Sequence, residues 1–174
     1  ADLKSPSRER RLVNARNALE YLLAKVPEVN PNQIYAAGHS SAGTAALLFA
    51  DLNKDSRDDV LMTQYGAQSI AVLLAGTPSG TLVTPPNVAG VGLRPIALTA
   101  AEVTGDSNLD VVVANFDGNS LSVLRGQGDG SFGSVSTVAV AEKPTAVAVA
   151  DMNSDGKPDL LVCNSGRNQV WILL

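Results

Sequence analysis

The sequence has few of the residues that form disulfides, cysteine-based metal sites or aromatic platforms. Of its 174 residues one is cysteine, one is histidine and 4% are aromatic. A single cysteine cannot form an internal disulfide or a cysteine metal site, and Cys163, in the apolar run 160–163, is expected to be a buried structural thiol. So few aromatic residues also argue against stacking platforms and aromatic cages.

Long hydrophobic runs are missing as well. The longest, residues 44–50, falls far short of the about 20 residues that a membrane-spanning helix needs, so no membrane partner is predicted. The polar beginning ADLKSPSRERR predicts no signal peptide. A processed signal stays open, because the chain begins without Met.

Positive charge is scarce after the first 30 residues. Residues 1–30 carry six Lys or Arg and four Asp or Glu, whereas residues 31–174 carry seven and thirteen. We therefore predict no nucleic-acid partner, because phosphate binding requires the opposite sign. Clustered carboxylates favour a hard cation instead, while scattered ones are typical of a solvated surface.

Three segments of the chain repeat one another at a spacing of about 50 residues. They are ADLNKDSRDDVLMT, AEVTGDSNLDVVVA and ADMNSDGKPDLLVC, starting at Ala50, Ala101 and Ala150. Matching blocks follow them, QSIAVLLAG, NSLSVLRGQ and NQVWILL, and RPIALTA and KPTAVAVA precede the second and third. These short runs of Val, Leu, Ile and Ala, bounded by turn residues, predict strands joined by turns.

The size of this repeat predicts propeller blades of three or four strands each. A single β-sandwich is the alternative, although a sandwich does not require a constant period. The strand TAVAVA at 145–150 is apolar at every position but its first and is expected to be buried on both faces. We predict a mainly β fold with partial blades, about two and a half repeats, over residues 44–93, 94–142 and 143–174.

Oxygen-bearing side chains follow a calcium-loop spacing in each repeat. Gly156 allows a sharp turn, and calcium takes about six to eight oxygen ligands in flexible geometry. The loop is not an EF-hand, because position 12 is Val162 and the flanks are strands. In the third copy, positions 1, 3, 5, 7 and 9 are Asp151, Asn153, Asp155, Lys157 (through its backbone carbonyl) and Asp159.

The other two copies repeat this pattern less completely. The same positions are Asp51, Asn53, Asp55, Arg57 and Asp59 in the first copy, and Glu102, Thr104, Asp106, Asn108 and Asp110 in the second. We expect calcium to occupy the third loop most, then the first, then the second. The alternative is that Asp and Asn only build tight turns between strands.

The third repeat and the segment GQGDGSF at 126–132 resemble the FG-GAP (VCBS) repeats of integrin-α-like propellers, over about residues 50–174. The resemblance implies blades with a calcium-stabilised loop between their first two strands. It also implies an extracellular or surface setting and a role in adhesion, carbohydrate binding or scaffolding, with a carbohydrate or protein ligand. A complete ring usually has about four to eight blades, more than are found here.

The N-terminal part has a different pattern. Ser5 and Pro6, followed by apolar residues at helical spacing, predict a helix over 7–26, and a strand is predicted at 33–37. The next segment, GHSSAG at 38–43, has the form of a nucleophile elbow. Residues 8–49 resemble α/β-hydrolases of the prolyl-oligopeptidase and dienelactone-hydrolase kind, with Ser40 at the nucleophile position.

A serine nucleophile needs a base, and the single histidine, His39, adjoins Ser40 within the motif. No histidine or acid of a triad, and no strands for an oxyanion hole, are recognisable. We therefore expect Ser40 to be a structural remnant. A residual serine esterase or peptidase-type hydrolase acting through Ser40 is the alternative function.

The segment TAALLFADLN could be the helix after an elbow or the first strand of a blade. Three repeats require the strand, so we predict one at 45–50, although local propensity favours a helix. The chain then joins a hydrolase-like fragment, residues 1–43, to propeller repeats, residues 44–174. It is interpreted as a chimera, natural or engineered.

Both fragments have sheet edges to cover. We therefore predict a homo-oligomer, for example a dimer of six blades, in which strand 33–37 of one copy completes the third repeat of another. The predicted function is a non-enzymatic, calcium-binding, β-propeller-like assembly. A recombined chain that folds without an evolved activity is a further reading.

Overall fold

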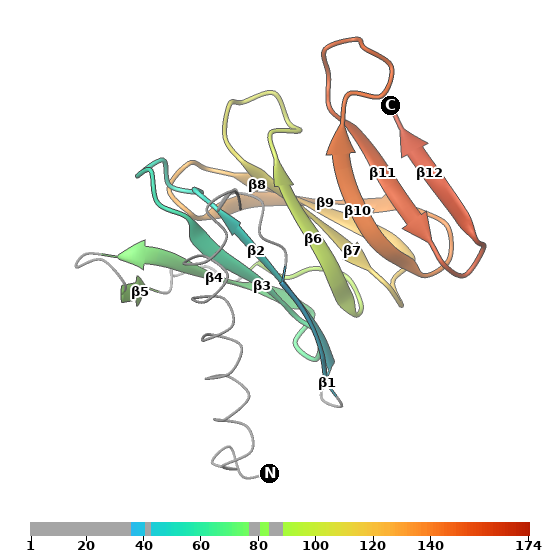
Figure 1. Ribbon diagram of the computed structural model, residues 1–174, viewed down its shortest axis with the longest axis horizontal. Helices are drawn as coiled ribbons and strands as arrows, with labels where there is room; N and C mark the ends of the chain where they lie inside the picture. Colours follow the sequence, from blue (N-terminus) through green and yellow to red (C-terminus); the bar gives the residue numbers. More distant parts are fainter. Residues whose placement is uncertain (1–35, 41–42, 77–80, 84–88) are drawn as a thin grey trace, which may run out of the picture. The chain divides into compact units, whose positions relative to one another are not determined.

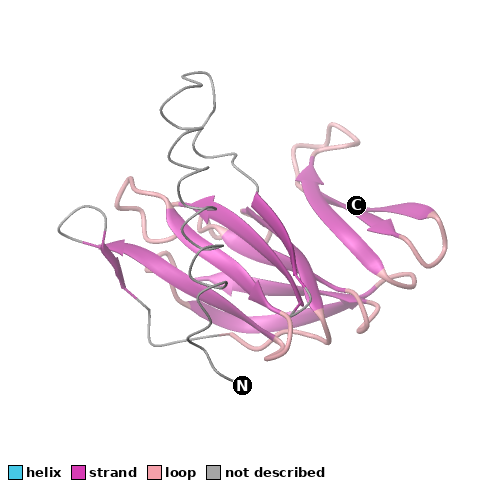
Figure 2. Cartoon of the chain, turned by 60° about the horizontal axis from the view of Figure 1, so that its bottom comes forward, coloured by secondary structure: helices cyan, strands magenta, loops and turns pink. Residues whose placement is uncertain are grey.

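Each repeat folds into an antiparallel sheet, as its short runs of Val, Leu, Ile and Ala predict. The computed structural model describes residues 36–40, 43–76, 81–83 and 89–174, all within one compact unit, Tyr35–Leu174. Every regular element in this part of the chain is a strand (Figure 1, Figure 2), so the mainly β fold is confirmed. The described residues contain no helix that could span a membrane. The helix expected at 7–26 lies outside them.

The strands follow one another in chain order within three sheets. The first sheet contains β1 (Ala36–Ser40), β2 (Gly43–Ala50), β3 (Asp59–Gln64), β4 (Ser69–Gly76) and β5 (Thr81–Val83). The second contains β6 (Pro95–Ala101), β7 (Asp110–Asn115), β8 (Ser120–Gly126) and β9 (Phe132–Ala139). The third contains β10 (Pro144–Ala150), β11 (Asp159–Asn164) and β12 (Gln169–Leu173). The strand expected at 45–50 is confirmed by β2.

The backbone repeats closely from one sheet to the next. The pairs Val60↔Leu73, Val111↔Leu124 and Leu160↔Leu173 occupy the same register between the second and third strands of the repeats. The turn before the third strand contains a residue with positive φ in every copy, namely Gln68 (51°), Asn119 (47°) and Asn168 (51°). Equivalent positions in the three repeats can therefore be compared directly.

Two apolar clusters join the sheets. The first contains Leu61, Ile70 and Val72 of the first sheet together with Val111 and Val113 of the second. The other joins the second and third sheets and contains the buried side chains Val112, Ala114, Leu121 and Val162. Strand β7 therefore contributes alternate residues to both clusters, and every residue in it is buried.

Burial on both faces was predicted for TAVAVA in β10, and this is wrong. Ala146 and Ala148 are exposed, and Val147 and Val149 are half-buried. Cys163 on the neighbouring strand β11 is also exposed, contrary to the expected buried thiol. The cause is the same in both cases, since one face of the third sheet packs on the second sheet while the described residues place nothing on the other.

The segment that resembles a nucleophile elbow belongs to a pair of strands. Strand β1 pairs antiparallel with β2, with Ser40 opposite Gly43. A strand, not a helix, therefore follows Ser40, and the strand–turn–helix form that an elbow requires is not present. Strand β1 also pairs within its own chain, so this structure does not show the predicted strand exchange. Residues 33–35 of that predicted strand lie outside the described residues.

Candidate metal-binding loops

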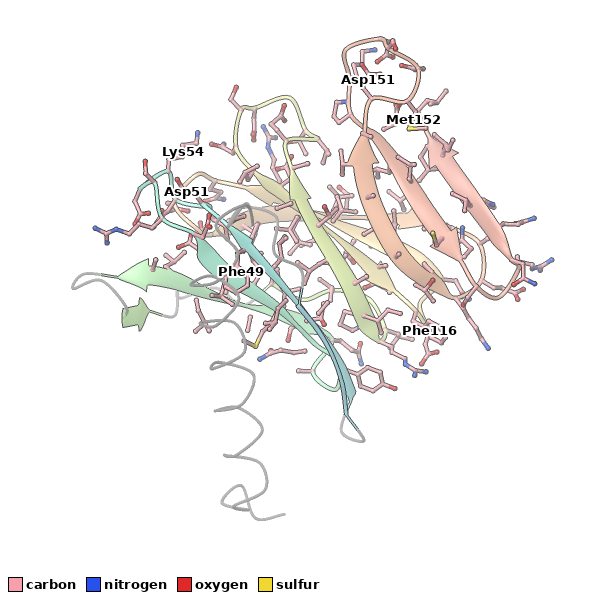
Figure 3. All side chains as sticks on the ribbon, viewed as in Figure 1. Phe49, Asp51, Lys54, Phe116, Asp151 and Met152 are labelled. Carbon is pink, nitrogen blue, oxygen red and sulfur yellow. The ribbon has the colours of Figure 1, made fainter. Side chains whose placement is uncertain are left out.

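Three loops occupy the same place in the three sheets. We name them loop 1 (residues 51–59), loop 2 (102–110) and loop 3 (151–159). Each follows the first repeat strand (β2, β6 or β10) and ends on the first residue of the next (β3, β7 or β11). Figure 3 shows Asp51 and Lys54 of loop 1 and Asp151 and Met152 of loop 3 at the same end of the sheets, away from Phe116.

The backbone of each loop turns through two residues in the left-handed region, at positions 4 and 6. The values of φ are 62° and 64° at Lys54 and Ser56, 79° and 66° at Gly105 and Ser107, and 62° and 81° at Ser154 and Gly156. The sequence analysis singled out Gly156 alone. Side chains that disfavour this conformation nevertheless adopt it, because hydrogen bonds inside the loop hold the turn.

In loop 1 these hydrogen bonds orient the side-chain oxygens at positions 1, 3 and 5. Asp51 Oδ1 and Oδ2 accept from the backbone N–H groups of Asp55 (3.0 Å) and Ser56 (2.8 Å). Asn53 Oδ1 accepts from the same Asp55 N–H at 3.1 Å. Asp55 Oδ1 accepts from the N–H of Arg57 at 2.9 Å. Three predicted ligands thus converge on one turn of backbone.

Loop 3 repeats this arrangement atom for atom. Asp151 accepts from the N–H groups of Asp155 (3.2 Å) and Gly156 (2.9 Å), and Asn153 Oδ1 accepts from that of Asp155 at 2.9 Å. Asp155 Oδ1 accepts from the N–H of Lys157 at 2.8 Å. Serine in place of glycine at position 6 therefore does not change the geometry of loop 1.

The aspartates at position 9 are buried and bind backbone. Asp59 and Asp110 are 0% exposed and Asp159 is 1% exposed. Asp59 accepts from the N–H groups of Leu52 (2.9 Å) and Ala75 (2.8 Å), so it joins its loop to the end of β4. Burial raises the pKa of Asp59, and the negative charges of Asp55 and Asp51 raise it further, although the two N–H donors oppose these effects.

The other two position-9 carboxylates also bind backbone N–H groups, and Asp110 also reaches the end of β8. Asp110 accepts from Val103, Thr104 and Gly126, each at 2.9 Å, and Asp159 accepts from Met152 at 2.8 Å. From the sequence these residues were expected to be ligands or to build turns, and the binding of backbone by their buried carboxylates was missed. One signal was available: an aspartate stands directly before a run of apolar residues at the start of this strand in all three repeats.

Two positively charged side chains from outside loop 2 contact it. Glu102 Oε1 accepts from the N–H groups of Gly105 and Asp106, and Asp106 Oδ1 accepts from that of Asn108 at 2.9 Å. The other oxygen of Asp106, Oδ2, binds Arg125 Nε at 2.8 Å. Lys54 Nζ, from loop 1, donates to Asn108 Oδ1 at 2.8 Å. The hydrogen bond from Arg125 lowers the pKa of Asp106.

These positions limit how a cation could be held. Within the described ranges, no three His, Cys, Asp or Glu side chains gather closely enough to hold a metal ion. A cation in loop 1 or loop 3 would therefore take two carboxylates, one amide oxygen and the carbonyl at position 7. Such an all-oxygen set is the chemistry that calcium prefers.

Comparison with protein families identifies the repeat. Residues 102–162 match the model of the FG-GAP-like repeat. The FG-GAP-like segment runs from loop 2 to β11 and so includes all of loop 3. No curated protein matches the chain. The resemblance to FG-GAP repeats is thereby confirmed for this segment, and the three sheets form a β-propeller-like repeat assembly. The match does not extend to residues 8–49, so it gives no support to a hydrolase fragment or a chimera.

Proposed function

We propose that the chain is a non-enzymatic, calcium-binding β-propeller-like assembly in which loops 3 and 1 hold the ions. The observation that carries this proposal is the shared geometry of the two loops. Both orient two aspartates and an asparagine with the same four hydrogen bonds, although position 6 is Ser56 in one and Gly156 in the other.

Calcium would add stability at a defined place. It would neutralise the carboxylates at positions 1 and 5, which the turn brings together, and would thus fix the connection between the first two strands of a sheet. An extracellular setting fits this function, because extracellular calcium modules bind with dissociation constants of about 10⁻⁴–10⁻³ M. The proposal names no carbohydrate or protein ligand.

Thermal unfolding tests the proposal. Calcium at about 100 times its dissociation constant should stabilise the fold by about 2.7 kcal/mol per site, and magnesium should do so less. Asp151→Asn should remove part of the calcium-dependent shift in Tm. Asp129→Asn is the matched control, since Asp129 lies outside the loops and accepts from Ser131. A Tm that is equal in calcium and in chelator would overturn the proposal.

We also propose that a second copy of the chain covers the outer face of the third sheet. That face carries Leu161 and the exposed residues Cys163, Val170 and Ile172. Of the equivalent residues of the second sheet, Val112, Ala114 and Leu121 are 0% exposed and Val123 is half-buried, because the third sheet covers this face.

Light scattering tests this part of the proposal. We expect a discrete oligomer, a dimer in the simplest case, that Val170→Asp dissociates because the substitution buries a charge in the contact. Ser136→Asp on β9 is the control, since it adds the same charge at an exposed site of the second sheet. A wild-type chain that is monomeric at all concentrations would contradict the proposal.

A further inference from the structure

Two cations from outside loop 2, Arg125 and Lys54, contact its side chains. Leu74, Arg125 and Leu174 occupy equivalent positions in the three sheets. Each directly follows the third-strand leucine that pairs with the second strand, namely Leu73, Leu124 or Leu173. The position-4 residues are Lys54, Gly105 and Ser154. Arginine therefore occurs at the end of the third strand in the second repeat only, and lysine occurs at position 4 in the first repeat only.

Both cations reach the oxygens at positions 5 and 7 of loop 2. Arg125 binds Asp106 Oδ2 at 2.8 Å, and the Asp106 side chain is 16% exposed. Lys54 binds Asn108 Oδ1 at 2.8 Å. In loops 1 and 3 the corresponding oxygens, Asp55 Oδ2 and Asp155 Oδ2, accept from neutral amides, those of Asn53 (3.3 Å) and Asn153 (3.1 Å). Rotation of the Asn53 or Asn153 amide would free these oxygens to bind a cation. The guanidinium of Arg125, in contrast, is always positively charged.

We propose that Arg125, with Lys54, is a resident cation of loop 2 that takes the place of a metal ion. The guanidinium neutralises Asp106 and holds the loop in the conformation of loops 1 and 3, so that loop 2 keeps its shape without calcium. The same positive charge repels a divalent cation. Loop 2 therefore binds calcium at least tenfold more weakly than the other two loops. This comparison rests on the proposed function of loops 1 and 3.

The first experiment counts the calcium ions bound per chain by isothermal titration. We expect two for the wild type and three for Arg125→Gln, which keeps the length of the side chain and removes its charge. Arg167→Gln is the matched control, because Arg167 pairs with Glu142 at 2.7 Å on the surface outside the loops. A count that Arg125→Gln leaves unchanged would overturn the inference.

A second variant transfers the cation to loop 3. Leu174 is 82% exposed, and it lines a cleft of about 460 Å³ together with Asp155 and Lys157. Leu174→Arg therefore places a guanidinium beside loop 3 at little cost in packing. We expect the calcium affinity of loop 3 to fall at least tenfold, and Leu174→Gln to leave it nearly unchanged. Equal affinities in the two variants would contradict the inference.

Unfolding in chelator separates this inference from the proposed function. Without metal, Arg125→Gln should lower Tm more than Arg167→Gln does, because the side chain of Asp106 is 16% exposed and that of Glu142 is 51% exposed. If the wild type binds no calcium, the proposed function fails while this comparison still decides the role of Arg125. Equal losses of Tm in the two variants would show that Arg125 is an ordinary surface partner.

Discussion

At position 6 of each loop the backbone has a positive φ, and the side chain there decides how much strain the turn contains. Ser56 adopts 64° and Gly156 adopts 81°. Ser56→Gly should stabilise the fold by about 0.5–1 kcal/mol, since glycine enters this region without a steric penalty. Gly156→Ser should destabilise it by a similar amount. No heavy atom beyond the two neighbouring residues lies within 4 Å of where a Cβ at Gly156 would be, so Gly156→Ser causes no clash and measures only the cost of the positive φ. Denaturant unfolding in chelator measures both, and shifts of the same sign would contradict the explanation.

The buried aspartates at position 9 form a graded series. The structure shows three backbone N–H donors at Asp110, two at Asp59 and one at Asp159. Substitution by Asn places an amide N–H₂ against buried donors and should cost about 1–3 kcal/mol, in the order Asp110, Asp59, Asp159. Urea unfolding of the three variants gives the order. A loss that is largest at Asp159 would contradict the structural role.

The pair of Asp106 and Arg125 has a definite pH dependence. Because Arg125 lowers the pKa of Asp106, the pair stabilises the fold above the unfolded value of about 3.9 and this contribution is lost as pH falls through the lower folded value. The destabilisation by Arg125→Gln should therefore be complete at neutral pH and vanish in acid. Tm measured against pH in chelator tests this. In an Asp106→Asn background the same substitution should show no such dependence.

At the scale of the strands and their junctions, cations also link the sheets at the end opposite the loops. The guanidinium of Arg94 lies 5.0 Å from the ring of Tyr65 and 4.6 Å from that of Phe116, and Lys143 Nζ lies 5.9 Å from the Phe116 ring. Arg94 of the second repeat thus contacts Tyr65 of the first, and Phe116 of the second repeat contacts Lys143 of the third.

Removal of the Phe116 ring should abolish two cation–π contacts, that with Arg94 in its own repeat and that with Lys143 of the third. Phe116→Leu keeps an apolar side chain and should cost about 1–2 kcal/mol, since exposed cation–π contacts contribute about 0.5–1 kcal/mol each. Lys143→Gln, which removes the longer of the contacts, should cost less. Chemical unfolding measures the two losses, and a larger effect of Lys143→Gln would contradict this assignment.

Much of the arrangement of the strands could be predicted from the repeats. The three copies predicted β2 as a strand although Ala and Leu favour a helix there, because sheet pairing outweighs local propensity. They could not show that β10 is exposed, since burial depends on what packs against a sheet. The repeats also could not show that Asp59 and Asp55 have different roles. Their spacing tells which side chains carry oxygen, but not which of them bind the backbone. The contact between Arg125 and Asp106 spans 19 residues and has no local pattern.

At the scale of the whole molecule, three similar sheets follow one another, each with an acidic loop in the same place. We propose that loops 1 and 3 bind an external cation, whereas Arg125 and Lys54 contact loop 2 from outside it. Two apolar clusters hold the sheets together, one between the first and second sheets and one between the second and third.

The most direct test of this account is the number of calcium ions bound per wild-type chain, measured by native mass spectrometry at saturating calcium. The account predicts two. No bound ion would show that the loops are turns held by their own hydrogen bonds, and three bound ions would show that Arg125 does not replace the metal. Either result would contradict the account.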